Sequence, residues 1–102
     1  MTPQVADGKA VLGAPAELNI YHAAAFRDAL IAAFNSGADV EIDLAQTGEM
    51  DAAGLQLLLL AHRESAAHGR ALTLRAPSEA VQDVLGLCNV ASWFAIAPGA
   101  AG

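Results

Sequence analysis

The sequence predicts a two-layer α/β domain in which helices pack on one face of a mixed sheet of four to five strands. Apolar and polar residues alternate over residues 39–44 and again over residues 72–75, a pattern typical of strands buried on one face. Residues 52–68 lie between them with a helical period, and the order strand, helix, strand predicts a parallel pair with a right-handed connection. Because the strands alternate and are not apolar throughout, we expect the opposite face of the sheet to be polar and open.

Two short strands are predicted before the first helix. Residues 9–12 form a weak strand that ends at the turn residues 13–15, and residues 17–20 form a second short strand. We interpret the pair as a hairpin. A helical period begins at Tyr21 and ends at the Asn-Ser-Gly sequence of residues 35–37. The buried face of this helix is predicted to carry Ala23, Phe26, Ala29, Leu30 and Ala33.

The length of 102 residues is typical of one domain. We predict that the domain extends over residues 9–97, between flexible segments at residues 1–8 and 98–102, because both ends consist mainly of small residues that do not fill a core. An apolar stretch near the end contains Trp93 and Phe94. The pattern leaves open whether these two aromatic side chains complete the core or contact a partner.

The long helix predicted over residues 52–68 begins after Glu49 and Asp51 and ends at Gly69. The two acids are expected to cap the helix, since carboxylates are favoured at a helix N-terminus. On a helical wheel, the stripe facing the sheet is predicted to contain Leu55, Leu58, Leu59, His62 and Ala66. Leu57 and Leu60 are predicted on the outer face, where they are either ordinary exposed leucines or part of a partner-binding patch.

A third helix is predicted after Pro77, with Ser78 as its N-cap. Its inner face is expected to carry Val81, Val84, Leu85 and Cys88. Because Cys88 is the only cysteine, the chain cannot form an internal disulfide, and a single buried thiol fits a reducing compartment. We therefore expect a soluble, cytoplasmic protein.

The charge balance excludes several classes of partner. Eleven Asp and Glu against five Lys and Arg give a net charge of −6, and the basic residues form no stripe. We expect neither nucleic-acid binding nor attachment to an anionic membrane surface. No apolar run is long enough to span a bilayer, so direct membrane insertion is not expected either.

Catalytic and cofactor motifs are absent from the sequence. It contains neither a glycine-rich phosphate-binding loop nor a dinucleotide-binding glycine pattern, so no cofactor is expected. His22, His62 and His68 lack the four-residue spacing that would place two imidazoles on one helix face, which argues against a metal site. A catalytic triad assembled in space, or a small-ligand site between sheet and helices, is left open by sequence alone.

One region of the sequence resembles a known family. Residues 40–56, a strand followed by a loop and the Asp51-Ala52-Ala53-Gly54-Leu55 start of a helix, resemble the STAS domain, the sulfate-transporter and anti-sigma-factor-antagonist family. The likeness covers nearly all of residues 9–96 and implies the STAS fold. Further landmarks that resemble the family are residues 16–21 before the first helix, Asp43-Leu44 in the central strand and residues 77–81 at the third helix.

The resemblance implies a non-enzymatic switch protein. In the anti-sigma-antagonist branch, a Ser or Thr one or two positions after the loop aspartate is phosphorylated by a partner kinase of the histidine-kinase-like ATPase fold. Here those positions are Ala52 and Ala53, and Thr47 does not match the acceptor position. We therefore expect a phosphorylation-independent module that regulates a signalling, transcription-linked or chemotaxis-linked partner. Its partner-binding residues are expected to be Asn19, Tyr21, His22, Asp51, Ala53, Gly54, Leu55 and Leu57.

The resemblance also supports an alternative function. Stand-alone STAS proteins resemble the small cytoplasmic subunit that binds the ATPase of an ABC-type phospholipid transport system. That branch usually has a Thr in the loop, which this sequence lacks. A second copy of the chain is a further candidate partner, through Leu57, Leu60 and the apolar residues 93–96.

Overall fold

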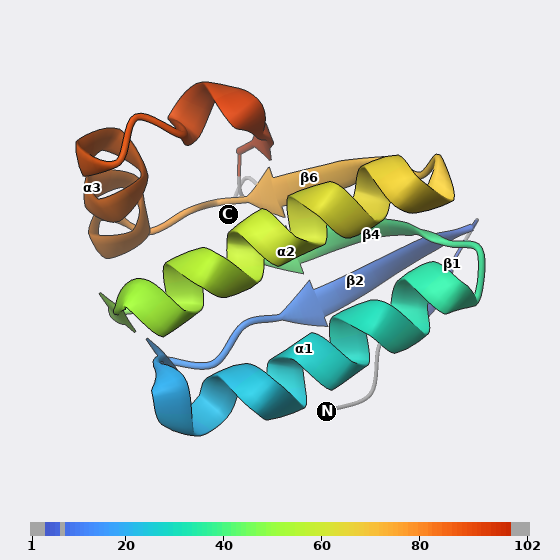
Figure 1. Cartoon of the computed structure of the whole chain (residues 1–102), viewed down its shortest axis with the longest axis horizontal. Coiled ribbons are helices and arrows are strands. Elements are labelled where there is room, and N and C mark those ends of the chain that lie inside the picture. Colours follow the sequence, from blue (N-terminus) through green and yellow to red (C-terminus); the bar gives the residue numbers. More distant parts are fainter. Residues whose placement is uncertain (1–3, 7, 99–102) are drawn as a thin grey trace.

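The computed structural model describes residues 4–6 and 8–98 and confirms the two-layer α/β architecture (Figure 1). One sheet of five strands has the order β1-β2-β4-β6-β7, with β1 antiparallel to its neighbour and the other strands parallel. A separate two-stranded parallel sheet pairs β3 with β5. The elements are β1 (Gln4–Ala6), β2 (Lys9–Gly13), β3 (Glu17–Leu18), α1 (Ile20–Asn35), β4 (Asp39–Asp43), β5 (Glu49–Met50), α2 (Ala52–His68), β6 (Leu72–Arg75), α3 (Glu79–Leu87), the short 3-10 helix η1 (Ala91–Trp93) and β7 (Ala95–Ala97).

The central strands have the predicted alternation. In β4, Val40 and Ile42 are buried, and they stand in register with the buried Leu72 and Leu74 of β6. The parallel pairing of these strands through the α2 crossover is as predicted. On the opposite face, the carboxylate of Glu41 lies 3.9 Å from Lys9 Nζ and 3.6 Å from a guanidinium nitrogen of Arg75.

Helices α1 and α2 lie side by side over the same face of the sheet and run in the same direction (Figure 1). The predicted inner face of α1 is largely confirmed: Phe26, Ala29, Leu30 and Ala33 are buried, together with Phe34, whereas Ala23 is partly buried. Helix α2 ends as predicted at Gly69, whose φ of 62° is the left-handed conformation that glycine adopts readily. The third helix is capped as predicted, since the Ser78 side chain accepts a hydrogen bond from the Val81 amide.

The predicted hairpin of residues 9–12 and 17–20 is wrong. Both edges of β2 are already paired, one with β1 and the other with β4, so no edge is left for a hairpin partner. The predicted start of the domain is also wrong in part, because Gln4–Ala6 form the edge strand β1. Residues 1–3, 7 and 99–102, which belong to the predicted flexible segments, lie outside the described residues.

The predicted outer face of α2 is wrong for Leu57, which is only 4% exposed. Helix α1 packs against this side of α2, so α2 is covered by the sheet and by a neighbouring helix at once. The buried stripe is therefore Gly54, Leu57, Leu58, Ala61 and Ser65. Leu55, Leu59, Leu60 and His62 are partly buried, and Ala66 is exposed.

Two further predictions near the C-terminal end need correction. Helix α3 ends at Leu87, so Cys88 is the residue after the helix and its thiol is exposed, not part of the inner face. The aromatic pair is divided between two environments. Phe94 is 8% exposed and packs edge-on against His62, with ring centroids 5.7 Å apart, whereas Trp93 is 53% exposed.

The burial of Leu57 leads to a direct test. Replacing Leu57 by Ala removes a side chain that is enclosed between α1, α2 and the sheet, and we expect the free energy of unfolding to fall by about 2–4 kcal/mol. The matched control is Leu87→Ala, because Leu87 is 84% exposed and its loss should change stability by no more than about 0.5 kcal/mol. Urea denaturation measures both, and equal effects would contradict the packing of α2 against α1.

Candidate functional site

The two-residue strands β3 and β5 place the starts of α1 and α2 next to each other. Leu18 pairs with Met50, so the residues that follow them, Asn19 and Asp51, lie at equivalent positions. Both are N-caps. The Asn19 side chain accepts a hydrogen bond from the Tyr21 amide at 3.1 Å, and Asp51 accepts one from the Gly54 amide at 3.1 Å. Asn and Asp are favoured at this position because their side-chain oxygens satisfy amides that have no partner within the helix.

Asp51 also connects the two helices. While Oδ1 caps its own helix, Oδ2 accepts a hydrogen bond from the backbone amide of Ile20, the first residue of α1, at 3.3 Å. The Asn19 side chain is only 9% exposed and lies 3.0 Å from Nδ1 of His22. Of the residues predicted to bind a partner, Asp51 thus joins the two helix starts, and Asn19 caps its own helix.

Gly54 lies where the helix backbone comes closest to β3. A Cβ atom built on Gly54 would overlap the carbonyl oxygen of Leu18 and lie 2.6 Å from Cγ of Met50. Only glycine fits this position without a backbone shift. Gly54 is therefore a structural residue, although the sequence placed it in the binding loop.

The accessible members of the predicted site are on the first turns of the two helices. Tyr21 is 87% exposed, and Ile20, which the prediction did not include, is 69% exposed. His22 and Ala52 are exposed, whereas Ala53 and Leu55 are partly buried. The structure thus brings the Tyr21 turn and the start of α2 together into one surface.

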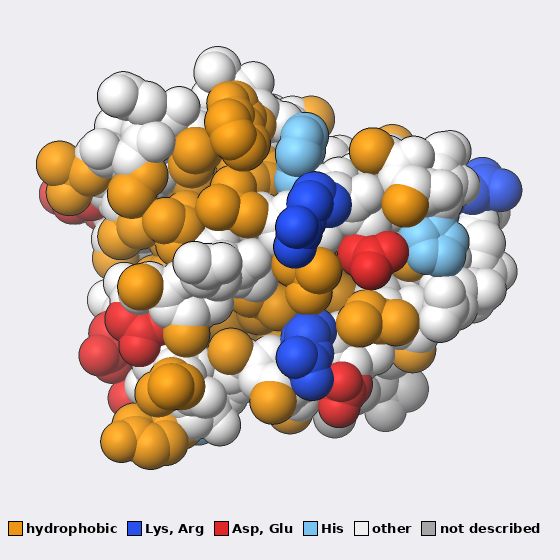
Figure 2. All heavy atoms as spheres, in the orientation of Figure 1, with side chains coloured by type: hydrophobic (Ala, Val, Ile, Leu, Met, Phe, Trp, Pro, Cys, Tyr) orange, Lys and Arg blue, Asp and Glu red, His pale blue; other side chains and the backbone are white. Residues whose placement is uncertain are grey.

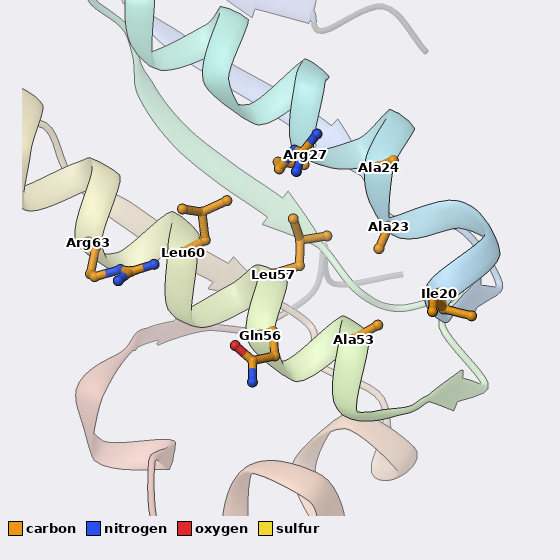
Figure 3. A pocket seen from close by; sticks show the side chains of 9 residues that line it. All are labelled: Ile20, Ala23, Ala24, Arg27, Ala53, Gln56, Leu57, Leu60 and Arg63. Atoms are coloured by element: carbon orange, nitrogen blue, oxygen red, sulfur yellow. The ribbon is translucent and has the colours of Figure 1, made fainter.

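A groove of about 450 Å³ runs between α1 and α2 from these first turns (Figure 3). Ile20, Ala23 and Arg27 line it from α1, and Ala53, Leu57 and Leu60 line it from α2. The sequence analysis missed this groove because it placed Leu57 on an open outer face. The sequence carried one signal for the groove. In both helices, residues that line it recur at spacings of three and four, and small residues stand on the sides that face each other.

Acidic side chains lie both at the edge where α2 begins and beside the basic side chains of this face. Figure 2 shows carboxylates along the edge where α2 begins and two basic side chains in the middle of the helical face. Glu17 and Glu49 are paired residues of β3 and β5, and Asp51 follows them. These acids lie beside helix N-termini, whose unpaired amides favour negative charge.

Other polar residues considered as candidates make structural contacts. Thr47 is fully buried and its hydroxyl donates to the carbonyl oxygen of Pro15 at 2.9 Å, so it is not available as a phosphate acceptor. His62 packs against Trp93 and Phe94, and His68 lies 3.5 Å from a carboxylate oxygen of Glu64. Within residues 4–6 and 8–98, no group of three or more His, Cys, Asp and Glu side chains is placed to hold a metal ion. None of the helices described combines the length and the apolar character that crossing a membrane requires.

A family model described as "Mlab, STAS domain" matches residues 1–96. The fold is also similar to solved structures. A protein of Thermotoga maritima described as a putative anti-sigma-factor antagonist is 24% identical with a TM-score of 0.83, over 93% of this chain and 83% of that one. No curated protein sequence matches.

Two further structures have the same fold. The anti-sigma-factor antagonist SpoIIAA in its unphosphorylated form is 22% identical with a TM-score of 0.78, over 94% of this chain and 86% of that one. A STAS domain protein of Planctomyces limnophilus is 16% identical with a TM-score of 0.79, over 99% and 92% of the two chains.

The close approach at Gly54 predicts an unusual response to alanine. In an ordinary helix interior, Gly→Ala stabilises by about 0.5–1 kcal/mol, and we expect this of Gly86→Ala in α3, where an added Cβ meets nothing within 4 Å. At Gly54 the same change should instead destabilise by about 1–3 kcal/mol, because the methyl group would force β3 away from α2. Denaturation midpoints of the two variants decide this, and a stabilised Gly54→Ala would contradict the geometry.

Proposed function

Because this chain belongs to the STAS domain family, we propose that it is a non-enzymatic module of the anti-sigma-factor-antagonist type that binds a regulatory protein partner without being phosphorylated. The observation that carries the proposal is the position of Ala52 and Ala53. They lie in the first turn of α2, and Ala53 lines the groove beside Ile20; the resemblance matches these two positions to the acceptor of the anti-sigma-antagonist branch. Neither alanine can accept a phosphate.

The proposed binding surface consists of Ile20, Tyr21, Ala53, Leu55 and the groove between the helices. Ile20 and Tyr21 expose large apolar side chains at its rim. Tyrosine is among the residue types that most often supply much of the binding free energy of an interface. Asp51 and Gly54 keep this surface in place from below, since they join α2 to α1 and to β3. The module would thus present a surface that is already formed before the partner arrives.

The absence of an acceptor supports a constant binding state. SpoIIAA has been described in an unphosphorylated and in a phosphorylated form. A phosphate adds about −1.5 to −2 charges and would alter a contact surface at a helix start. This chain cannot receive that charge at Ala52 or Ala53. The fraction of the chain that has the partner bound would then depend on the concentration and state of the partner.

The partner that fits this proposal is an anti-sigma factor or serine kinase of the histidine-kinase-like ATPase fold. Such a pair would work in the cytoplasm and would regulate transcription or a related signalling pathway. Release of the partner's own client, for example a sigma factor, would be the output. A catalytic role is not part of the proposal, because the described residues place no nucleophile beside a base.

The proposal is tested by placing a negative charge at the start of α2. Ala53→Asp should strongly weaken capture of the partner from the native cytoplasm, while the thermal midpoint stays nearly unchanged because an acid in the first turn suits the helix dipole. Ala66→Asp is the matched control, since Ala66 is exposed in the same helix and lies about 20 Å further along it. Affinity capture read by mass spectrometry gives the result.

The identity of the captured protein distinguishes the candidate functions. Recovery of a histidine-kinase-like ATPase that is lost with Ala53→Asp but kept with Ala66→Asp would support the regulatory function. Recovery of an ATPase and a permease of a transport system would contradict it. Capture that is the same for both variants and the unchanged chain would remove the start of α2 from the interface.

A further inference from the structure

The groove between α1 and α2 has two chemically different ends. At the end formed by the first turns, Ile20 and Ala53 line it, and the exposed carboxylates of Glu49 and Asp51 lie nearby in the chain. Further along, its lining includes Arg27 from α1 and Arg63 from α2 (Figure 3). Two of the five basic residues of a chain with net charge −6 thus line one apolar groove. Asp28 is paired with Arg27 and Glu64 follows Arg63, but the two charged residues of the lining itself are both basic, which favours a negatively charged occupant.

Both guanidinium groups are available for a partner. Arg27 has one ion pair, 3.7 Å to the neighbouring Asp28, and both of these side chains are more than half exposed. An exposed pair of this kind is worth little and is easily exchanged for a better one. Arg63 is exposed, and among the described residues it takes part in no ion pair or side-chain hydrogen bond. Arginine can hold a carboxylate with two parallel hydrogen bonds.

The walls of the groove fit a helix. The lining positions of α1 are 20, 23, 24 and 27, and those of α2 extend from 53 to 63, so the groove is about 10–15 Å long, or two to three turns of a third helix. The side chains of Ala23, Ala24 and Ala53 are small, so another backbone can approach the groove closely. Leu60, which is partly buried, provides apolar contact along the α2 side, whereas the buried Leu57 has almost no exposed surface there.

We infer that the groove binds an acidic amphipathic helix of the protein partner, with apolar residues at a spacing of three and four and carboxylates that pair with Arg27 and Arg63. This inference rests on the proposed function and names the chemistry of the partner at that same site. Carboxylates at the opposite end of this helix would meet no basic residue of the lining, so they gain no ion pair there. Acids are most stable in the first turn of a helix. The first turn of the bound helix therefore lies at the Arg27 and Arg63 end of the groove, and the bound helix runs antiparallel to α1 and α2.

The inference is tested with an unbiased library of displayed helical peptides of 14 residues, selected on the immobilised full chain. The expected binders carry two or more acids in the first turn, followed by apolar residues at a spacing of three and four. A synthetic peptide of the selected sequence should bind at least about tenfold more weakly to the double variant Arg27→Gln, Arg63→Gln. Arg70→Gln is the matched control, because Arg70 is exposed after the end of α2 and outside the groove, and it should keep the affinity within about twofold.

Several outcomes would overturn the inference. These are selected peptides without acids, an equal loss for Arg70→Gln, or a library with no binder. A chain that sediments as a dimer, and is converted to a monomer by the double variant, would assign the groove to a second copy.

The result also separates this inference from the proposed function. Peptides without acids that bind the unchanged chain and lose binding with Ala53→Asp would reject the acidic chemistry and leave the docking surface in place. Acidic peptides that depend on Arg27 and Arg63 but bind Ala53→Asp unchanged would support the inference and contradict the docking role of Ala53.

Discussion

The pairing of β3 with β5 is the contact on which the functional face depends. Each strand has two residues, and the amides of Gly48 and Glu49 donate to the carbonyl oxygen of Ala16 at 2.9 and 3.2 Å. Because Leu18 and Met50 are paired, the N-caps that follow them lie at the same level along the two strands. The two long helices therefore start side by side. A short pair of strands thus sets the relative position of two helices of 16 and 17 residues.

The third helix is tied to the same place. The Ser78 hydroxyl, which caps α3, donates a hydrogen bond to the carbonyl oxygen of Thr47, two residues before β5. Three helix N-termini therefore meet around residues 47–51. Backbone amides at these ends favour acids, which accounts for the carboxylates at this edge. The proposed binding surface includes helix ends and small residues, whose positions are set by the packing of the core.

Much of the fold could be predicted because its signals are local. The alternation in β4 and β6, the period of α1 and the cap residues Ser78 and Gly69 each depend on neighbours within a few positions. The errors have a common cause. The burial of Leu57, the pairing of β2 and the exposure of Cys88 depend on which other elements lie alongside, and one sequence does not contain that information. A helical wheel assumes a single covered side, whereas α2 is covered on two.

The sequence by itself determined the order and type of the main elements, the family and the lack of a hydroxyl at Ala52 and Ala53. Only the tertiary structure decided that Gly54 must be glycine, that Asp51 joins two helix starts, and that Arg27 and Arg63 line one groove. These properties arise between residues more than thirty positions apart in the chain. Their distances are set by the pairing of β3 with β5 and by the packing of α1 against α2, which no local pattern in either helix encodes.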